Sequence, residues 1–423
     1  MQNLVERDYY TDHDIGRNPY EFFEAVRAHG PIYKPPSRDY WIVTGFDEVI
    51  EVLTNTRDFS AAIALQGAAA PLPFEPQGSD ISAQIVEHQR EFVGWDLVTE
   101  YDDTQHKNSR SLLNRLFVPS RLKANQDFIT AYSDRIVKEV VAKGGCDLIN
   151  EVATPFVTLI IADLLGVPEE DRQSFMDTIA AAPPPGNLDG VDRQTTTSPL
   201  EVMAKYFIGY VMDRRANPRN DILSELANAK FPDGTTPDAM EIVRLSTFLF
   251  AAGQDTSAKL LGNAMRYIVD VPGLQDQLRA DPTLIPALLE EVLRLEGSTK
   301  VLARVARRDT KVGGMDFPAG SKFMLSIAGA NRDPRRWDEP NAFKLNRPGI
   351  KEHLAFGRGA HTCAGAPLAR TEVRIILEKF LEHTSHIDIS EEKHGPHGNR
   401  NYVFEPSFIT RGLAELHITC TPR

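Results

Sequence analysis

Apolar side chains recur along most of this chain with the spacing of helices that bury one face. The longest such stretches predict helices over residues 102–117, 119–143, 148–165, 238–271 and 366–383. Shorter helices are expected at residues 19–29, 46–55, 168–181, 198–217, 221–228, 272–280 and 285–295. The pattern therefore predicts a mainly helical protein.

A few short segments have the β-branched and aromatic content of strands. They lie at residues 32–33, 40–44, 314–317, 322–327, 402–404 and 416–419, with a Pro-Ala-Gly turn at 318–320. The sequence contains no repeats and no low-complexity linker. We therefore expect an α+β fold, mainly α with small β-sheets, in one domain that spans residues 1–423.

Composition narrows the class of protein. A formal net charge of −12 argues against nucleic acid as a partner. Cys146, Cys363 and Cys420 are far apart, which gives no disulfide framework and fits a reducing cytosol. The first residues are acidic and polar, unlike a signal peptide, and the longest strongly apolar helical stretch is taken to be 245–252, too short for a bilayer. We expect a soluble, cytoplasmic protein without a membrane anchor.

The segment FGRGAHTCAGAPLAR, residues 356–370, is the most informative part of the sequence. Its glycines let the backbone adopt positive φ and pass close to a flat group. A helix that begins at Cys363 would direct free N–H groups and its positive dipole end at the sulfur, which favours thiolate. A lone cysteine excludes a tetrahedral zinc cluster. Cys363 is then either a thiolate ligand of a metal or a buried structural cysteine.

The spacing F-G-x-G-x-H-x-C-x-G-x-x-L-A-R resembles the haem-thiolate loop of the cytochrome P450 monooxygenases. This resemblance implies a heme b group (iron protoporphyrin IX, called haem below) with Cys363 as the axial ligand of its iron. It also implies the cytochrome P450 fold, in which the haem lies between the oxygen-binding helix and the cysteine-loop helix. The C-x-x-C-H pattern of covalent haem attachment is absent, so the haem is expected to bind non-covalently.

A second motif, AAGQDT at residues 251–256, interrupts the apolar pattern of the 238–271 helix. A glycine inside a helix costs about 1 kcal/mol relative to alanine, so Gly253 needs a reason. The motif resembles the family's oxygen-binding signature A-G-x-D/E-T. The resemblance implies two catalytic roles: Thr256 holds the hydrogen-bond network at the oxygen, and Asp255 relays protons from solvent. The alternative is a threonine that bonds back to a carbonyl in an ordinary core helix.

A charged set follows in the family's order. Glu291 and Arg294 form an E-x-x-R pattern on one helix face, and Arg347 follows downstream. The resemblance implies a buried structural network of these three residues that braces the haem, with no catalytic role.

Haem has two propionates that need cations or hydrogen-bond donors. By resemblance, the residues that would bind them are His106, Arg110, Arg304 and His361. A solvated side chain is the alternative for each one.

The substrate pocket is also assigned by resemblance. The candidates, mostly apolar, are Phe248, Leu249, Ala252, Thr299, Val301, Phe408 and Ile409. Such a lining favours a small to medium hydrophobic substrate, for example terpenoid, aromatic or steroid-like. Lys300 lies between two of these positions, in a segment where the family commonly has proline. We expect Lys300 to turn outward with its ammonium in water, the alternative being contact with a substrate carboxylate.

Two long stretches, 60–100 and 182–198, show no regular pattern. Loops of this length are usually functional lids or disordered segments. They fall where the cytochrome P450 family has its substrate-covering loops, so we expect lids, with inert insertions as the alternative.

These features predict a haem-thiolate monooxygenase that inserts one oxygen atom of dioxygen into its substrate. The electrons are expected from a ferredoxin and its reductase, steered by the basic residues Lys107, Arg115, Arg358 and Arg374, unless these are scattered surface charges. A peroxide-driven peroxygenase is the alternative among enzymes, although relatives of that kind lack the acid–alcohol pair. A non-catalytic haem sensor is the alternative outside enzymes.

Overall fold

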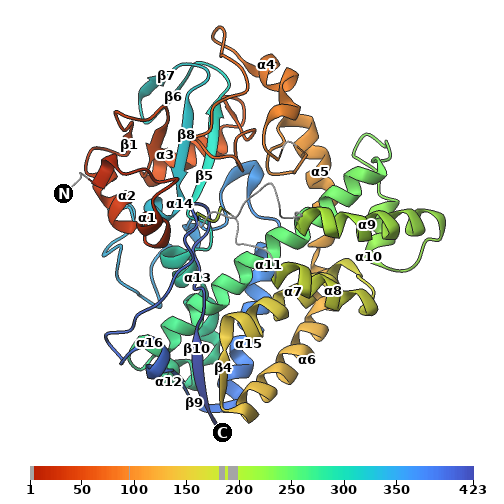
Figure 1. Cartoon of the computed structure of the whole chain (residues 1–423), viewed down its shortest axis with the longest axis vertical. Helices are drawn as coiled ribbons and strands as arrows, with labels where there is room; N and C mark the ends of the chain where they lie inside the picture. The colour runs from red at the N-terminus through yellow and green to blue at the C-terminus, as the bar shows by residue number, and fades with distance from the viewer. Residues whose placement is uncertain (1–3, 95, 181–185, 189–198) are drawn as a thin grey trace.

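Helices make up about half of the described chain, which covers residues 4–94, 96–180, 186–188 and 199–423 of a computed structural model. The longest of them, α11, crosses the middle of the molecule diagonally (Figure 1). The α-helices are α1 His13–Arg17, α2 Tyr20–Arg27, α3 Phe46–Thr54, α4 Ser82–Glu87, α5 Asp103–Leu116, α6 Pro119–Lys143, α7 Thr154–Leu165, α8 Arg172–Ala180, α9 Pro199–Ala216, α10 Ile222–Ala227, α11 Ala239–Asp270, α12 Leu274–Ala280, α13 Ile285–Glu296, α14 Ile327–Ala330, α15 Ala366–His383 and α16 Glu391–His394.

The strands form small sheets, the largest in the upper part of Figure 1 and a three-stranded one, β4-β10-β9, at the bottom. They are β1 Ile32–Tyr33, β2 Trp41–Val43, β3 Phe59–Ser60, β4 Gly145–Asp147, β5 Val301–Ala306, β6 Thr310–Val312, β7 Met315–Phe317, β8 Lys322–Ser326, β9 Thr384–Ile389 and β10 His417–Pro422. The largest sheet has the order β1-β2-β8-β5-β3, with β2 and β8 parallel and the other neighbours antiparallel. The architecture is the mainly helical α+β fold that the sequence predicts.

The main apolar core surrounds α11, which packs against α7, α9, α13 and α15. The Asp238 side chain accepts a hydrogen bond from the Met240 N–H and so caps the start of α11. The neighbouring α15 also packs against α6 and α13. These contacts fix α11 relative to the segment that precedes α15.

The predicted helices are confirmed, two of them with their boundaries: 119–143 is α6 and 366–383 is α15. The 148–165 stretch begins as a π-helical turn, Leu148–Ala153, and continues as α7. The prediction that residues 245–252 are the longest strongly apolar helical stretch is wrong, because 148–165 is longer. This stretch is apolar and long enough to cross a membrane, but 67% of it is buried inside the protein, as in a core helix.

The strand prediction was less complete. Residues 402–404 form only an isolated bridge, Phe404 with Leu413, instead of a strand. Residues 301–306 are not among the predicted strands, yet they form β5, which lies between β8 and β3 in the largest sheet. The missed strand matters for the site, because successive side chains of a strand point to opposite faces.

The two long irregular stretches have different outcomes. The 60–100 stretch contains α4 and the short 3₁₀ helix Gln89–Glu91. Of the 182–198 stretch only residues 186–188 are described, and the rest lies outside the described residues. Leu188 donates its N–H to the Pro406 carbonyl (2.8 Å), so this part contacts the C-terminal segment. The lid role of both stretches stays a prediction.

Candidate active site

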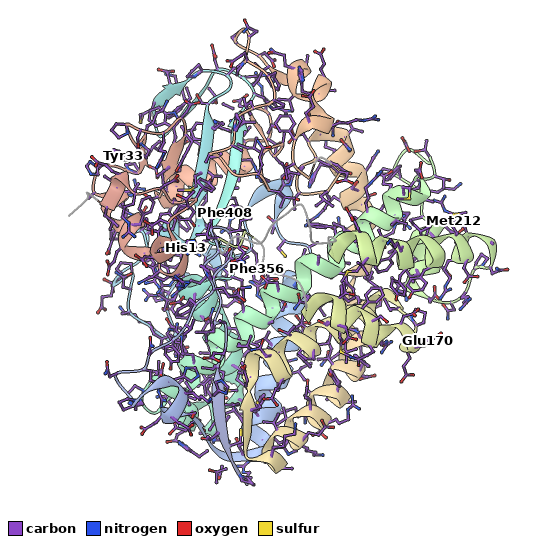
Figure 2. All side chains as sticks on the ribbon, viewed as in Figure 1. His13, Tyr33, Glu170, Met212, Phe356 and Phe408 are labelled. Carbon is purple, nitrogen blue, oxygen red and sulfur yellow. The ribbon has the colours of Figure 1, made fainter. Side chains whose placement is uncertain are left out.

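The cysteine loop is a tight turn that runs from Phe356, labelled in Figure 2, to the start of α15. The Cys363 N–H donates to the Phe356 carbonyl at 2.9 Å, which closes the loop. Gly357 and Gly359 have φ of +70° and +76°, and a Cβ on Gly359 would lie 2.6 Å from the Leu53 carbonyl oxygen. Only glycine fits this approach to the end of α3.

The helix begins at Ala366, so the expectation that it starts at the cysteine itself is corrected. The backbone N–H groups of Gly365 and Ala366 still donate to the Cys363 sulfur. Burial nevertheless raises the pKa of the Cys363 thiol, against the lowering by these N–H groups and by Arg110. The protein alone therefore keeps a thiol here, and a metal cation would be needed to hold the thiolate.

A cavity of about 330 Å³ separates the cysteine loop from α11. One wall contains Phe356, Gly357, Cys363 and Leu368, while the opposite wall contains Phe248, Leu249, Ala252, Gly253 and Thr256. The lining is mainly apolar, with polar groups gathered at a few points. The two motifs of the sequence thus face the same space.

The helix wall shows why α11 carries its central glycine. A Cβ on Gly253 would lie 2.6 Å from Ile161 Cδ1 of α7, so the glycine allows the two helices to pack closely. The Thr256 hydroxyl donates to the Ala252 carbonyl at 3.0 Å, and the Ser298 hydroxyl donates to the Thr256 carbonyl at 2.7 Å. Both contacts fix Thr256 at the cavity wall.

Asp255 does not line the cavity and forms an ion pair with Lys259, one turn further along α11. Lys259 is 4% exposed, and its Nζ also lies 2.7 Å from Glu405 Oε2 of the C-terminal segment. Sequence reasoning missed both partners. The i, i+4 spacing of Asp255 and Lys259 was a usable signal for the first, whereas nothing local points to Glu405.

Positively charged and imidazole side chains gather at one side of the cavity: His106, Arg110, Arg304 and His361 all line it. The rings of His106 and His361 lie 4.0 Å apart. Burial lowers the pKa of His361 to about 2, and the nearby Arg304, His106 and Arg110 lower it further in the same direction. The imidazoles are therefore neutral donors or acceptors beside two arginines.

Arg304 is 5% exposed and forms no ion pair within the described residues; its guanidinium donates to the Ala303 carbonyl at 2.7 Å. The acids Asp102 and Glu100 favour its charged form electrostatically, but neither forms an ion pair with it. Burial raises the pKa of Glu100 to about 9, and Asp102 accepts hydrogen bonds from Ser60 and Ala61. A buried cation without an ion-pair partner is costly, so this side of the cavity fits an anionic ligand group.

The three residues of the predicted charged network lie together. Glu291 accepts from Arg294 at 2.7 and 2.9 Å and from Arg347 at 2.9 and 3.1 Å. The side chains of Glu291 and Arg294 are fully buried, and that of Arg347 is 2% exposed. The Lys344 N–H adds a further bond to Glu291 at 3.0 Å. Glu291 and Arg294 belong to α13, which packs against α15, the helix that follows the cysteine loop.

Four of the seven predicted pocket residues line the cavity: Phe248, Leu249, Ala252 and Thr299. Val301, Phe408 and Ile409 lie outside it. On β5, Leu302 and Arg304 face the cavity, so the alternation of the strand turns Val301 to the opposite face. Phe408, labelled in Figure 2, packs against Tyr10 with ring centroids 5.2 Å apart.

The prediction that Lys300 turns outward into solvent is wrong, because its side chain is 0% exposed. Its ammonium donates to the carbonyls of Gly16 and Ser407, and burial lowers its pKa well below the usual value. The reason is tertiary: the Lys300 N–H donates to the Ile409 carbonyl at 2.8 Å, so the C-terminal segment covers this position. It does not line the cavity.

Glu372 is a further residue that the sequence reasoning missed. It is 1% exposed on α15, lines the cavity, and its Oε2 has no hydrogen-bond partner among the described residues. Burial raises the pKa of Glu372 to about 8, despite a hydrogen bond from Ser257. Its place on the apolar face of the helix, four residues from Leu368 and Ile376, was the available signal.

Comparison with known proteins agrees with this geometry. A sequence model of the family described as Cytochrome P450 matches residues 200–406. Cytochrome P450 144 of Mycobacterium tuberculosis is 30% identical over 385 residues, which cover 89% of this chain and 85% of that protein. The substrate-free Mycobacterium marinum cytochrome P450 CYP150A6 is 43% identical, with a TM-score of 0.92 over 99% of both chains. CYP109E1 from Bacillus megaterium, in complex with corticosterone, is 27% identical, with a TM-score of 0.80 over 96% of this chain and 99% of that one.

The chain belongs to the cytochrome P450 family and is a haem-dependent monooxygenase. The residues present fit a haem. A free thiol lines the cavity, where iron can bind it. Arg304, buried and without an ion-pair partner among the described residues, lines the same cavity and could pair with a propionate carboxylate.

Proposed function

We propose that this enzyme inserts one oxygen atom of dioxygen into a small to medium hydrophobic substrate, with electrons from a ferredoxin and its reductase. The observation that carries the proposal is the apolar cavity between Cys363 and the Ala252–Thr256 stretch of α11. A cavity with few polar groups selects apolar molecules by burial and orients them by those few groups.

Cys363 is proposed as the axial ligand of the haem iron, and His106, Arg110, Arg304 and His361 as the propionate-binding residues. When bound, haem supplies the activation of dioxygen, and the protein supplies position, protons and exclusion of water. Arg304 would hold one carboxylate in a buried, charge-assisted contact. The Glu291–Arg294–Arg347 network would brace the helix α13 behind the cysteine loop.

Thr256 and Asp255 are proposed as the catalytic residues of the protein. The Thr256 hydroxyl lies at the cavity wall and can donate to a group there by rotating away from the Ala252 carbonyl. Asp255 is its neighbour in sequence, does not line the cavity and pairs with the buried Lys259, and we propose that it relays protons from that side of α11 to Thr256.

The proposed substrate class rests on the lining residues Phe248, Leu249, Ala252 and Thr299. Ala252 is the smallest of these and leaves room beside the cysteine side of the cavity. A related enzyme has been solved with corticosterone, so a steroid-sized apolar molecule is a reasonable first ligand to test. Thr299 provides a hydroxyl that could orient one polar group of such a molecule.

Ligand-induced spectral change tests the substrate class. Titrating the ferric holoenzyme with terpenoid, aromatic and steroid compounds should shift the haem from low to high spin as the ligand displaces water. If only strongly polar or charged compounds produced the shift, the apolar-pocket proposal would fail.

Turnover of two variants tests the catalytic residues. Thr256→Ala should bind haem normally but consume reductant without matching product and release peroxide. Asp255→Asn should slow the proton-dependent steps, because it keeps the shape and removes the acid. If both variants still formed one product for each reductant consumed, the protons would travel by another route. Efficient product formation from peroxide alone would favour a peroxygenase.

The ferredoxin is proposed to dock beside the cysteine loop. Support comes from the exposed or half-buried basic residues Lys107, Arg115, Arg358 and Arg374 on α5, the loop and α15. Arg374 already pairs with Glu378 at 2.6 Å, which leaves Arg115 and Arg358 as the sharper tests. Reversing either charge should lower the reduction rate by an acidic ferredoxin at low salt and have less effect at high salt. An unchanged rate would remove the patch from the proposal.

We also propose that residues 1–423 act as one domain in the cytoplasm. The Lys300 ammonium joins the carbonyls of Gly16 and Ser407, so the two ends of the chain share one packed region. Cys146 and Cys420 are unpaired, which suits a reducing compartment.

A further inference from the structure

Two carboxylates share one buried ammonium next to the proposed catalytic pair. Lys259 Nζ contacts Asp255 Oδ1 and lies 2.7 Å from Glu405 Oε2. The Lys259 side chain is 4% exposed, whereas those of Asp255 and Glu405 are 18% and 22% exposed. The ammonium is therefore enclosed between an acid on α11 and an acid that still reaches solvent.

The charges at this cluster do not balance, since two ionised acids face a single cation. The other cations nearby are engaged elsewhere: Lys300 donates to two carbonyls, and Arg411 donates to Glu296 at 2.9 Å. Burial raises the pKa of Glu405, with Lys259 lowering it and Asp255 raising it. Both acids raise the pKa of Lys259 in spite of its burial. The surplus negative charge is thus relieved most easily by a proton on Glu405.

The cluster is held in place by the C-terminal segment. Glu405 donates its N–H to the Gly412 carbonyl at 3.0 Å, and Ala414 donates to the Val403 carbonyl at 2.9 Å. A Cβ on Gly412 would overlap Lys259 Cγ, so the glycine lets this segment close directly over the lysine stem. Lys259 cannot swing away without displacing the segment.

Two oxygens of the cluster, Asp255 Oδ2 and Glu405 Oε2, have no hydrogen-bond partner among the described residues, although Glu405 Oε2 lies at ion-pair distance from Lys259 Nζ. Asp255 Oδ2 is buried and has no hydrogen-bond partner among the described residues, while Oδ1 faces Lys259. A carboxylate that is held by one oxygen keeps the other available to receive or pass on a proton.

We propose that Glu405 and Lys259 form the solvent-side end of the proton path to Asp255. Lys259 gives a proton from Nζ to Asp255, and Glu405 returns one from Oε2 to Nζ. One N–H bond breaks and one forms, so the lysine stays an ammonium, and solvent reprotonates Glu405. Lys259 and Glu405 act through Asp255 and are positioning residues. The proposal rests on the proton role of Asp255 given under the proposed function.

The first test is spectroscopic and needs no turnover. Infrared difference spectra of the holoenzyme during a pH titration report protonated carboxylic acids. Glu405→Gln should remove one titrating carboxyl band, and Asp255→Asn should move that band to lower pH, because the negative neighbour is lost. An unchanged set of bands in Glu405→Gln would overturn the proposal.

The second test is kinetic, with haem content and the ferrous carbonyl spectrum as controls for folding. Glu405→Gln should slow reductant consumption in the presence of substrate roughly tenfold, flatten its pH dependence, and enlarge the solvent deuterium effect. Lys259→Arg should keep most of the rate, since arginine keeps the charge and the donors, whereas Lys259→Met should be as slow as Glu405→Gln. Equal rates for Lys259→Met and wild type would contradict the relay.

The proton role of Asp255 and the relay through Lys259 and Glu405 can be refuted separately. If Asp255→Asn slows the proton-dependent step and Glu405→Gln does not, the relay proposed here is wrong and the role of Asp255 stands. If Asp255→Asn has no effect, the proton role of Asp255 is wrong and the relay falls with it.

Discussion

Replacing Glu291 with glutamine tests the buried charge network behind the cysteine loop. Glu291 is 0% exposed and receives hydrogen bonds from Arg294, Arg347 and the Lys344 N–H. Glutamine has nearly the same shape, but it is neutral. The substitution therefore leaves two buried guanidinium groups without their counter-charge.

The expected cost follows from what the two arginines retain. Removing one partner of a buried ion pair typically costs about 3–5 kcal/mol. Arg294 keeps its bonds to the carbonyls of Asn331 and Pro340, at 2.9 and 2.7 Å, which favours the lower end. We expect a loss of about 3 kcal/mol in the free energy of unfolding, a large share of the roughly 5–15 kcal/mol of a typical domain.

Urea unfolding of the haem-loaded protein, followed by circular dichroism, measures this loss. Asp316→Asn is the matched control, because it neutralises an acid in an ion pair with Lys311 whose side chains are 79% and 66% exposed. That change should cost under about 1 kcal/mol. If Glu291→Gln lost no more stability than Asp316→Asn, the reasoning about the buried network would be refuted.

Three further substitutions have defined outcomes. Burial raises the pKa of Glu372 from 4.5 to about 8, so between these pH values the folded state binds more protons than the unfolded state and wild-type stability falls as the pH rises. The melting temperature of Glu372→Gln should not show this fall. An equal fall in the variant would contradict the shift assigned to Glu372. Arg304→Ala removes a buried cation and should speed haem transfer to an apoglobin by about 10–100-fold, since a charged hydrogen bond contributes about 1.5–3 kcal/mol; an unchanged rate would refute its propionate role. Ala252→Phe fills part of the 330 Å³ cavity and should raise the Kd of apolar ligands in spectral titrations, whereas tighter binding of large ligands would contradict the assigned wall.

Local signals explain why many helices could be predicted with their ends. Pro119 occupies the first turn of α6, and Gly144 adopts a left-handed conformation with φ of +82° just after its last turn. Both residues restrict the backbone locally, so the sequence alone marks these boundaries. The cysteine loop can also be predicted from local sequence, because its glycines and Cys363 lie within a few residues of one another.

The wrong or missing predictions concern residues whose surroundings are set by segments far away in the sequence. Lys300 is buried because Gly16 and Ser407, hundreds of residues apart in sequence, converge on its ammonium. Val301 was placed in the pocket because the alternation of β5 was not recognised, although Leu302 and Arg304 show the period of two. Glu405 joins the Asp255 cluster only through the folding of the C-terminal segment. Local pattern contains no information about such contacts.

The spectrum of the ferrous carbonyl complex tests the central claim, that Cys363 is the thiolate ligand of the haem iron, most directly. The wild-type protein and the control Cys146→Ala should show the red-shifted Soret band of thiolate ligation, and Cys363→Ala should not. Cys146 is a suitable control because it lies on β4, outside the cavity. A wild-type band like that of a histidine-ligated globin, or a red-shifted band that survives in Cys363→Ala, would contradict the account.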